Sequence, residues 1–298
     1  EKLSVLAALT GMEWLAPVRE ALVFMVAALL SPASPHSALF WPFLLTALVV
    51  GLVAWLYSRP KRERSPGAVL RAAFSPRVWG SRSCRADMRF FLVNAGLFPV
   101  LAGPLIVSSA AVGVAVAAGL EGVFGSPGTP IMGPVAVTVA YTVVFFVLMD
   151  FGRFLAHWAQ HRSSILWEFH KVHHSAEVLT PITNSRFHPL DLVLMGTGAA
   201  IGGGLATGAF LYLAAGEVTL VTVMGVHVGI MAYRVLGNLR HTHVWLSYGP
   251  LDRILVSPAM HQVHHSALPE HWNKNCGFAL AIWDRMFGTY CAPRQRIE

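Results

Sequence analysis

Two short stretches of the sequence repeat a cluster of three histidines almost letter for letter. Residues 170–176 read HKVHHSA, and residues 261–267 read HQVHHSA. The histidines of each copy are spaced i, i+3, i+4, which places them on one face of an α-helix. At the histidine content of this chain, composition alone would produce the pattern H-x-x-H-H only about 0.03 times. Two copies are therefore not a product of composition.

A third histidine cluster lies just upstream, because His157 and His161 are spaced i, i+4. Of the 14 histidines in the chain, all but His36 lie after residue 150. The three clusters offer more imidazoles than the four ligands that one tetrahedral zinc ion takes. They predict two metal ions, and imidazole favours zinc, copper, iron or nickel over magnesium or calcium. The alternative for any single histidine is that it snorkels at a membrane surface or caps a helix.

The acidic residues near the clusters do not follow the pattern of a carboxylate di-iron site. Such sites in soluble four-helix bundles combine glutamates with Glu-x-x-His motifs. The acidic residues that lie near the histidines in the sequence show no such repeat; they are Asp150, Glu168, Glu177 and Asp191. We therefore expect a centre whose ligands are mainly nitrogen atoms.

The composition places these clusters in a membrane protein. Hydrophobic residues make up 55% of the 298 residues, charged residues make up 12%, and the mean hydropathy is +0.55. Soluble globular domains carry about 25% charged residues. The three cysteines, Cys84, Cys276 and Cys291, show neither C-x-x-C spacing nor the density of a disulfide scaffold. We expect an all-α protein, a polytopic transmembrane bundle of about five or six spans with a cytosolic histidine-rich helical cap.

Runs of about 20 apolar residues predict the spans that must position the clusters. The candidate runs are 38–57, 131–149, 90–120, 192–215, 218–233 and 21–30. The run 90–120 is interrupted by Pro99, Gly103 and Pro104, so we expect it to be kinked or to dip back into the membrane. The runs after residue 190 predict a hairpin of two spans, the first of them rich in glycine, which suits close helix packing or an acyl groove. Whether residues 14–31 form a first span or a signal segment stays open.

The loop between Arg59 and Arg89 sets the orientation. It carries nine arginine and lysine residues against two acidic residues, and the positive-inside rule therefore predicts that it is cytosolic. Counting crossings from this loop places all the histidine clusters on the same face. The basic pI of about 9.7 then reflects a cytosolic surface beside anionic lipid, and nucleic acid need not be a partner. We expect N-terminal helices and the basic loop in residues 1–130 and the histidine-rich part in residues 131–298, within one integrated membrane domain.

Residues 140–291 resemble the fatty acid hydroxylase and sterol desaturase superfamily of integral-membrane di-iron oxygenases. The motifs that carry the resemblance are HWAQH, LWEFHKVHHS, RFHPLD, SPAMHQVHHS and NKNCGFALAIWDRMFGTY. Residues 1 to about 130 match the superfamily only in being hydrophobic. The resemblance implies metal ligands at His157, His161, His170, His173, His174, His241, His261, His264 and His265.

Other residues receive weaker roles from the same resemblance. His243 departs from the asparagine that many members carry, and it is a candidate for an additional ligand or a hydrogen-bond donor to one. His188 is expected to orient a loop, and His271 is a candidate donor beside the ligands. Asp150 lies seven residues before His157, on about the same helical face, and is a candidate acceptor for a ligating imidazole. Two further expectations are that His227 is a core residue and that Asp284 partners Arg285 or a loop amide.

The resemblance also implies an activity. Two iron ions, with zinc as the alternative metal in purified protein, would use O2 to hydroxylate or desaturate a C–H bond of a lipid such as a fatty acyl lipid or a sterol. No residue beyond the metal centre is expected to be catalytic. Because this sequence contains no cytochrome b5 segment, electrons are expected from a separate ferredoxin, or from cytochrome b5 with a reductase. The alanine, glycine, valine and arginine content favours a bacterial inner membrane.

Two other classes of protein remain open at this point. A membrane metal transporter would carry ionisable ligands near the midplane of its spans, where only His227 is expected. A haem-binding membrane cytochrome would place pairs of histidines on facing spans. The doubled H-x-x-H-H motifs suit haem poorly, because adjacent histidines leave no room for a porphyrin on each.

Overall fold

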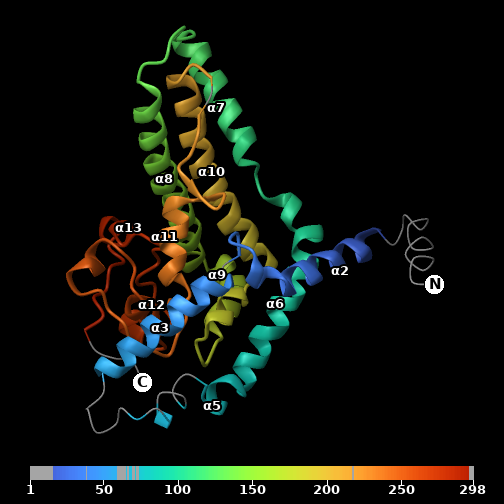
Figure 1. Cartoon of the computed structure of the whole chain (residues 1–298), viewed down its shortest axis with the longest axis vertical. Coiled ribbons are helices and arrows are strands. Elements are labelled where there is room, and N and C mark those ends of the chain that lie inside the picture. Colours follow the sequence, from blue (N-terminus) through green and yellow to red (C-terminus); the bar gives the residue numbers. More distant parts are fainter. Residues whose placement is uncertain are drawn as a thin grey trace.

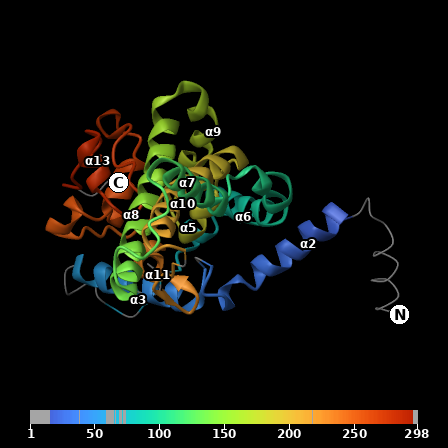
Figure 2. The same ribbon diagram turned by 90° about the horizontal axis from the view of Figure 1, so that it is seen from above.

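The computed structural model describes residues 16–37, 39–58, 65, 67–68, 71, 74–216 and 218–294. These residues are mostly helical, with one short two-stranded hairpin. Three long helices stand side by side at one end of the molecule, namely α7 (Ser109–Phe124), α8 (Pro134–Arg162) and α10 (Pro189–Leu213). At the other end, short helices gather beside the end of α8 (Figures 1 and 2). They are α9 (Ser164–His174), α11 (Val228–Gly237), α12 (Pro258–His264) and α13 (Ile282–Met286).

Three helices among the described residues are long and apolar enough to cross a membrane: Gly103–Phe124, Pro134–Arg162 and Pro189–Leu213. The first joins a 3-10 turn, η4 (Gly103–Leu105), to α7. The second and third contain most of the predicted runs 131–149 and 192–215. The predicted run 38–57 forms α3 (Trp41–Ser58), a shorter apolar helix, and α2 (Ala16–Leu29) covers the predicted run 21–30.

The apolar run 90–120 is divided between two helices. The first, α6 (Arg82–Leu101), contains Pro99 in its last turn, and η4 follows directly. Helix α7 then starts afresh with its own N-cap, Ser108, whose hydroxyl accepts from the backbone of Ala111. The break falls where proline and glycine remove backbone donors and add conformational freedom, as the sequence predicted.

The prediction of a second helical span over residues 218–233 was wrong. Strands β1 (Thr222–Val223) and β2 (Val226–His227) pair antiparallel there, and α11 follows with only ten residues. Met224 and Gly225 form the two-residue turn with φ angles of 52° and 75°, which is the pattern of a type I′ hairpin. The β-branched residues on either side of this turn favour the extended backbone, and hydropathy alone does not register that preference.

Glycines in α10 allow two neighbouring helices to approach it closely. A Cβ atom added at Gly202 would lie 2.0 Å from the backbone oxygen of Leu148 in α8. One added at Gly204 would lie 2.5 Å from Cβ of Val112 in α7. Of the two roles considered for this glycine-rich helix, the structure shows close packing.

Elements from the N-terminal part of the chain pack against the region of short helices. Helix α3 packs on α11, and α6 packs on α2 and on a 3-10 turn, η5 (Pro181–Ser185). The remaining short elements are η2 (Ser31–Ala33), α5 (Pro76–Trp79), η6 (Gly249–Arg253) and η7 (Pro269–His271). Residues before and after position 130 are therefore in direct contact.

Candidate metal centre

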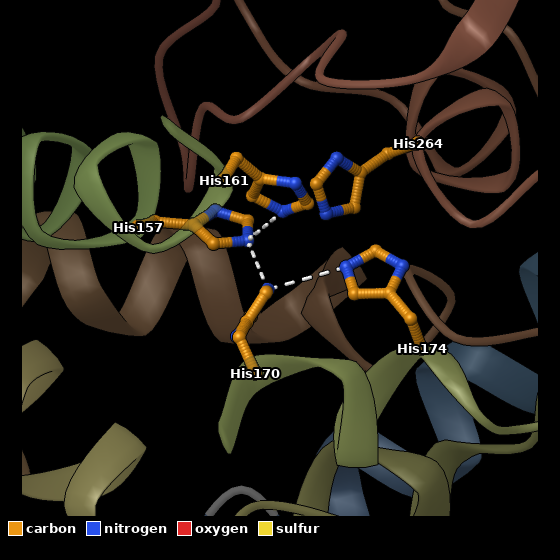
Figure 3. Close-up of side chains that lie close together, drawn as sticks. All are labelled: His157, His161, His170, His174 and His264. Carbon is orange, nitrogen blue, oxygen red and sulfur yellow. Dashed lines mark hydrogen bonds between the residues drawn. The ribbon is translucent and has the colours of Figure 1, made fainter. Parts of the chain in front are cut away.

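Nine histidines converge in two adjoining groups beside the end of α8. Figure 3 shows the first group, whose rings approach one another from α8, α9 and α12. In each group, one nitrogen atom of every ring lies within 4.8 Å of the others. The first group consists of His157, His161, His170, His174 and His264; the second consists of His173, His241, His261 and His265.

The two H-x-x-H-H motifs each contribute to both groups. In the first motif, His170 and His174 join the first group, whereas His173 joins the second. In the second motif, the pair at i and i+4 joins the second group and His264 joins the first. Residues at i and i+4 lie one above the other on a helix, and the residue at i+3 is rotated away from them. Each copy of the motif therefore supplies rings to both groups and links them through one short helix.

Local sequence signals fix the helices that carry these rings. Helix α9 begins at the N-cap Ser163, whose side chain accepts from the backbone of Leu166. Helix α12 begins at the N-cap Ser257 with Pro258 in its first turn, and the serine side chain accepts from the backbone of Met260. These caps satisfy donors that would otherwise be orphaned at each helix start, and they set the first residue of each helix.

Hydrogen bonds donated by Nδ1 determine the tautomer of three rings in the first group. His157 Nδ1 donates to the backbone oxygen of Cys276 at 2.7 Å, and His170 Nδ1 donates to the carboxylate of Asp191 at 3.0 Å. His264 Nδ1 donates to the backbone oxygen of Lys274 at 2.7 Å. These partners have only acceptor atoms, so the ring proton sits on Nδ1 and a lone pair is left on Nε2.

The bare Nε2 atoms point at one another. His157 Nε2 lies 3.0 Å from His170 Nε2, and both of these atoms carry lone pairs. His264 Nε2 is buried and has no hydrogen-bond partner within the described part of the chain. Facing lone pairs repel each other, and a buried acceptor without a donor is costly. A cation between them removes both penalties, so the chemistry of these donors fits a bound metal ion.

In the second group, the tautomer of one ring is fixed in the same way. His173 Nδ1 donates to the backbone oxygen of Arg186 at 3.2 Å, and the ring of Phe187 stacks on the imidazole with centroids 4.1 Å apart. His241 Nε2 lies 3.1 Å from His173 Nε2 and 2.9 Å from His261 Nε2. The ring nitrogens of this group are therefore as closely gathered as those of the first.

Burial keeps these imidazoles neutral. The pKa values of His173, His174, His241, His261, His264 and His265 all lie well below 6.5. Desolvation is the main cause in each case, and neighbouring histidines, or Arg240 beside His241 and His261, lower the pKa further. Neutral imidazole is the form that binds metal, so these rings are ready to bind without losing a proton.

The predicted role of Asp150 as an acceptor for a ligating imidazole was wrong. Its carboxylate instead accepts from the backbone of Ala279 and Leu280 and from Nε1 of Trp283. Asp284 accepts from the backbone of Cys276 and Gly277, which agrees with its expected role as a partner of loop amides. Both carboxylates hold the C-terminal segment that presents the Cys276 oxygen to His157.

Sequence reasoning missed the groups that orient the rings. Asp191, which is fully buried, is the carboxylate that accepts from His170. The only sequence signal for it was its place in the RFHPLD motif. The backbone oxygens of Arg186, Lys274 and Cys276 had no signal, because any residue type carries that atom.

The other predicted histidines lie outside both groups. His188 is the N-cap of α10, and its Nδ1 accepts from the backbone of Leu190, so it orients this junction as expected. His243 lines an apolar cavity of about 330 Å³, and His271 lies in η7. His227 is buried, bonds through Nε2 to the backbone oxygen of Thr142 and accepts from Gly229 through Nδ1. It is a core residue whose two nitrogens are both used.

Comparison with known proteins finds one family model and several relatives that are named for the oxidation of lipids. Residues 142–289 match the family model "Fatty acid hydroxylase". The chain is 34% identical over 157 residues to "Ornithine lipid hydroxylase OlsE" of Rhizobium tropici. This matched region covers 52% of this chain and 43% of that protein. The chain is 29% identical over 153 residues to the human "Alkylglycerol monooxygenase". This matched region covers 51% of this chain and 31% of that protein.

A third relative is the "Delta(7)-sterol 5(6)-desaturase" of Eremothecium gossypii, 29% identical over 158 residues that cover 53% of this chain and 39% of that protein. The matched regions thus span less than half the length of each of these relatives. No solved structure matches the chain. The matched family region contains every histidine of both groups. On the family match and these relatives, the chain belongs to the fatty acid hydroxylase and sterol desaturase superfamily.

Proposed function

We propose that this protein is a membrane di-iron oxygenase that uses O2 and external electrons to hydroxylate or desaturate a C–H bond of a lipid. One observation carries the proposal. Nine histidines, seven of them buried and two half-buried, form two adjoining groups, and those with a fixed tautomer point a bare nitrogen inward. In this proposal the ligands are the nine histidines of the two groups.

The relatives support a lipid substrate. Their names describe an ornithine lipid hydroxylase, an alkylglycerol monooxygenase and a sterol desaturase. These names denote lipids as the substrates. Among its described residues, this chain has three helices that are long and apolar enough to span a membrane. The names describe a hydroxylase, a monooxygenase and a desaturase, and each of these activities is compatible with oxidation of a C–H bond.

The histidine set supports iron over zinc as the working metal. The first group offers five imidazoles, one more than a tetrahedral zinc ion takes. When bound, iron would supply the redox chemistry that activates O2, which zinc cannot do. The residues of the chain fix the tautomer of four rings, and burial lowers the pKa of six of the nine rings well below 6.5.

The arrangement in the membrane is part of the same proposal. Exposed apolar side chains on α2 and α3, such as Val23 (60%) and Val49 (50%), support contact of both helices with lipid. The proposed number of spans is about five or six. The basic loop before α6 supports a cytosolic position for the histidine centre. The composition supports a bacterial inner membrane, and the electron donor would be a ferredoxin, or cytochrome b5 with its reductase.

The division at about residue 130 remains a proposal in this scheme. Residues 131–298 would form the catalytic domain, and the preceding helices would complete one integrated membrane unit. Metal transport was the alternative, and it would require available ligands within the spans. His227 was the expected candidate, but both of its ring nitrogens are engaged.

Metal content tests the proposal directly. Detergent-purified protein, expressed with added iron, is expected to contain about two metal ions per chain by plasma mass spectrometry. The single variants His173→Ala and His264→Ala, one from each group, should each lose metal, whereas His36→Ala, in an exposed loop, should not. Membranes from expressing cells should contain lipids with a mass gain of one oxygen. Folded protein with less than about half a metal ion per chain would overturn the proposal.

A further inference from the structure

Arg240 carries a buried guanidinium group and directly precedes His241 in the chain. The residue is only 7% exposed. Its Nη2 donates to the backbone oxygen of Gly277 at 2.8 Å, and its Nη1 donates to the backbone oxygen of Phe278 at 2.8 Å. Nη1 also donates to the hydroxyl of Tyr233 at 3.3 Å. The ring of Phe278 lies against the guanidinium, with its centroid 4.9 Å from the central carbon. These contacts hold the guanidinium in one place.

The segment that Arg240 binds also orients a ring of the first group. Gly277 directly follows Cys276, whose backbone oxygen accepts from His157 Nδ1 at 2.7 Å. Through the backbone, Arg240 is joined to His241, which belongs to the second group. The guanidinium therefore lies between the backbone of a ring in the second group and the backbone that supports a ring in the first.

The positive charge of Arg240 has no directly bonded carboxylate partner. None of the ion pairs within the described part of the chain includes this residue. Asp150 and Asp284 interact with it electrostatically, but their carboxylates accept from backbone amides of the C-terminal segment instead. Since little water screens a buried charge, the guanidinium acts strongly on the groups around it.

The second group of histidines is where this charge acts. Burial, and then the charge of Arg240, lower the pKa of His241 and His261. The same repulsion acts on a metal ion held by these rings, and it is stronger for an ion of higher charge. Neutral imidazoles are the only side chains in the two groups, so no anionic ligand offsets the repulsion. Arg240 therefore favours the less charged, reduced form of a metal ion in the second group.

We propose, on the basis of the oxygenase function above, that Arg240 raises the reduction potential of the metal ion bound by the second group. Arg240 is a positioning residue in this proposal, because it is not a ligand and acts through the fixed place of its charge. Net charge around a metal is one of the means by which proteins set its potential. Each iron ion takes one electron from the external carrier protein in passing from the ferric to the ferrous state.

A redox titration of iron-loaded protein in detergent tests this inference, with Mössbauer spectroscopy to count ferric and ferrous ions at each set potential. Arg240→Gln removes the charge and keeps an amide donor. At a fixed potential, it is expected to raise the ratio of ferric to ferrous ions by about tenfold for one of the two ions, the order of magnitude for a unit charge acting over roughly 10 Å in a protein. Arg240→Lys keeps the charge and should retain most of the original ratio. Arg253→Gln, the same change at an exposed position in η6, should leave the ratio unchanged.

Two results overturn the inference and leave the proposed function standing. One is an equal shift in Arg240→Lys and Arg240→Gln, which would mean that only the hydrogen bonds of Arg240 matter. The other is no shift in either variant. Folded protein that binds no iron overturns both the inference and the proposed function.

A second pair of variants answers the same question if Arg240→Gln does not fold. Ala232 is exposed and lines a cavity of about 260 Å³ together with Arg240. A carboxylate at this position offsets the charge of Arg240 and leaves its hydrogen bonds in place. Ala232→Glu is expected to raise the ratio of ferric to ferrous ions by about threefold to tenfold over Ala232→Gln, which has the same shape without the charge. Equal ratios in these two variants overturn the inference.

Discussion

At the scale of single residues, the orientation of each imidazole depends on an acceptor that the ring itself does not supply. His170 depends on Asp191, whose carboxylate is fully buried and lies 3.0 Å from Nδ1. A carboxylate in this position fixes the tautomer and raises the basicity of the ring as a metal ligand. Asp191 should therefore act on metal affinity without touching the metal.

Asp191→Asn is expected to lower the metal affinity of the first group by about tenfold to a hundredfold. The neutral amide still fits the space, but it no longer favours a proton on Nδ1 to the same degree. A chelator competition titration with purified protein measures the affinity, with cobalt as the probe metal. Glu177→Gln, at an exposed position, makes the same chemical change as a control. Equal affinities for the two variants would show that Asp191 has no such role.

The residue types and spacing of the sequence indicated which histidines gather, but not how they divide. The i, i+3, i+4 pattern placed His170, His173 and His174 on one helical face. Their division between two groups depends on where α8 and α12 lie, and sequence spacing within one helix carries no such information. His241 could be assigned only through family resemblance, because it lies outside every helix of the described chain.

At the scale of elements, α6 supports the second group from outside the matched family region. The side chain of Asn94 in α6 donates to the backbone oxygens of Ser185 and Phe187. The carboxylate of Asp87 in α6 forms a buried ion pair with Arg186 at 2.7 Å. This segment supplies both the backbone oxygen and the stacked ring that hold His173. Helix α6 therefore positions a predicted metal ligand through the backbone it anchors.

Asn94→Leu is expected to reduce metal occupancy from about two ions to about one, because His173 loses its fixed backing while the first group does not. The two lost hydrogen bonds should lower the free energy of unfolding by about 1–3 kcal/mol. Plasma mass spectrometry gives the occupancy, and a denaturant titration gives the stability. Met88→Leu, at a position that is 45% exposed on the same helix, is the control. A loss of stability with two ions retained would limit α6 to a structural role.

The contact between α8 and α10 gives a second prediction at this scale. Gly202→Ala would place a Cβ atom 2.0 Å from a backbone oxygen of α8, so the two helices would have to separate. We expect a large loss of folded protein, because backbone atoms cannot move aside as a flexible side chain can. Gly122→Ala in α7 has nothing within 4 Å of the new Cβ and should express normally. Detergent size-exclusion profiles compare the yields, and equal yields would contradict this packing.

At the scale of the whole molecule, hydropathy predicted the long apolar helices, but it did not predict every helix boundary or the β-hairpin within residues 218–233. The runs that became α8 and α10 were predicted because long apolar stretches have few other stable forms in a bilayer. The run 218–233 was assigned to a helix because its hydropathy hid the turn at Met224 and Gly225. The contacts of α3 with α11 and of α6 with η5 were not predictable, since no local pattern records which surfaces meet.

The metal centre joins segments that are far apart in the sequence. Rings from α8, α9, α12 and the loop at His241 meet there, and the lone pairs of His157 Nε2 and His170 Nε2 face each other at 3.0 Å. A ligand that binds only the folded state stabilises it by about 4 kcal/mol when its concentration exceeds its Kd a thousandfold. Metal should therefore contribute to the stability of the whole fold as well as to chemistry.

Removal of metal by a chelator is expected to lower the Tm of the detergent-solubilised protein by roughly 10 °C, and added iron or cobalt should restore it. Intrinsic tryptophan fluorescence during heating gives the Tm, and plasma mass spectrometry confirms that the metal has left. A double variant, His173→Ala with His264→Ala, should show a much smaller shift on chelation, because each group has lost a ring. An unchanged Tm after complete loss of metal would mean that the helices alone hold the histidines together, and that the facing lone pairs cost the fold little.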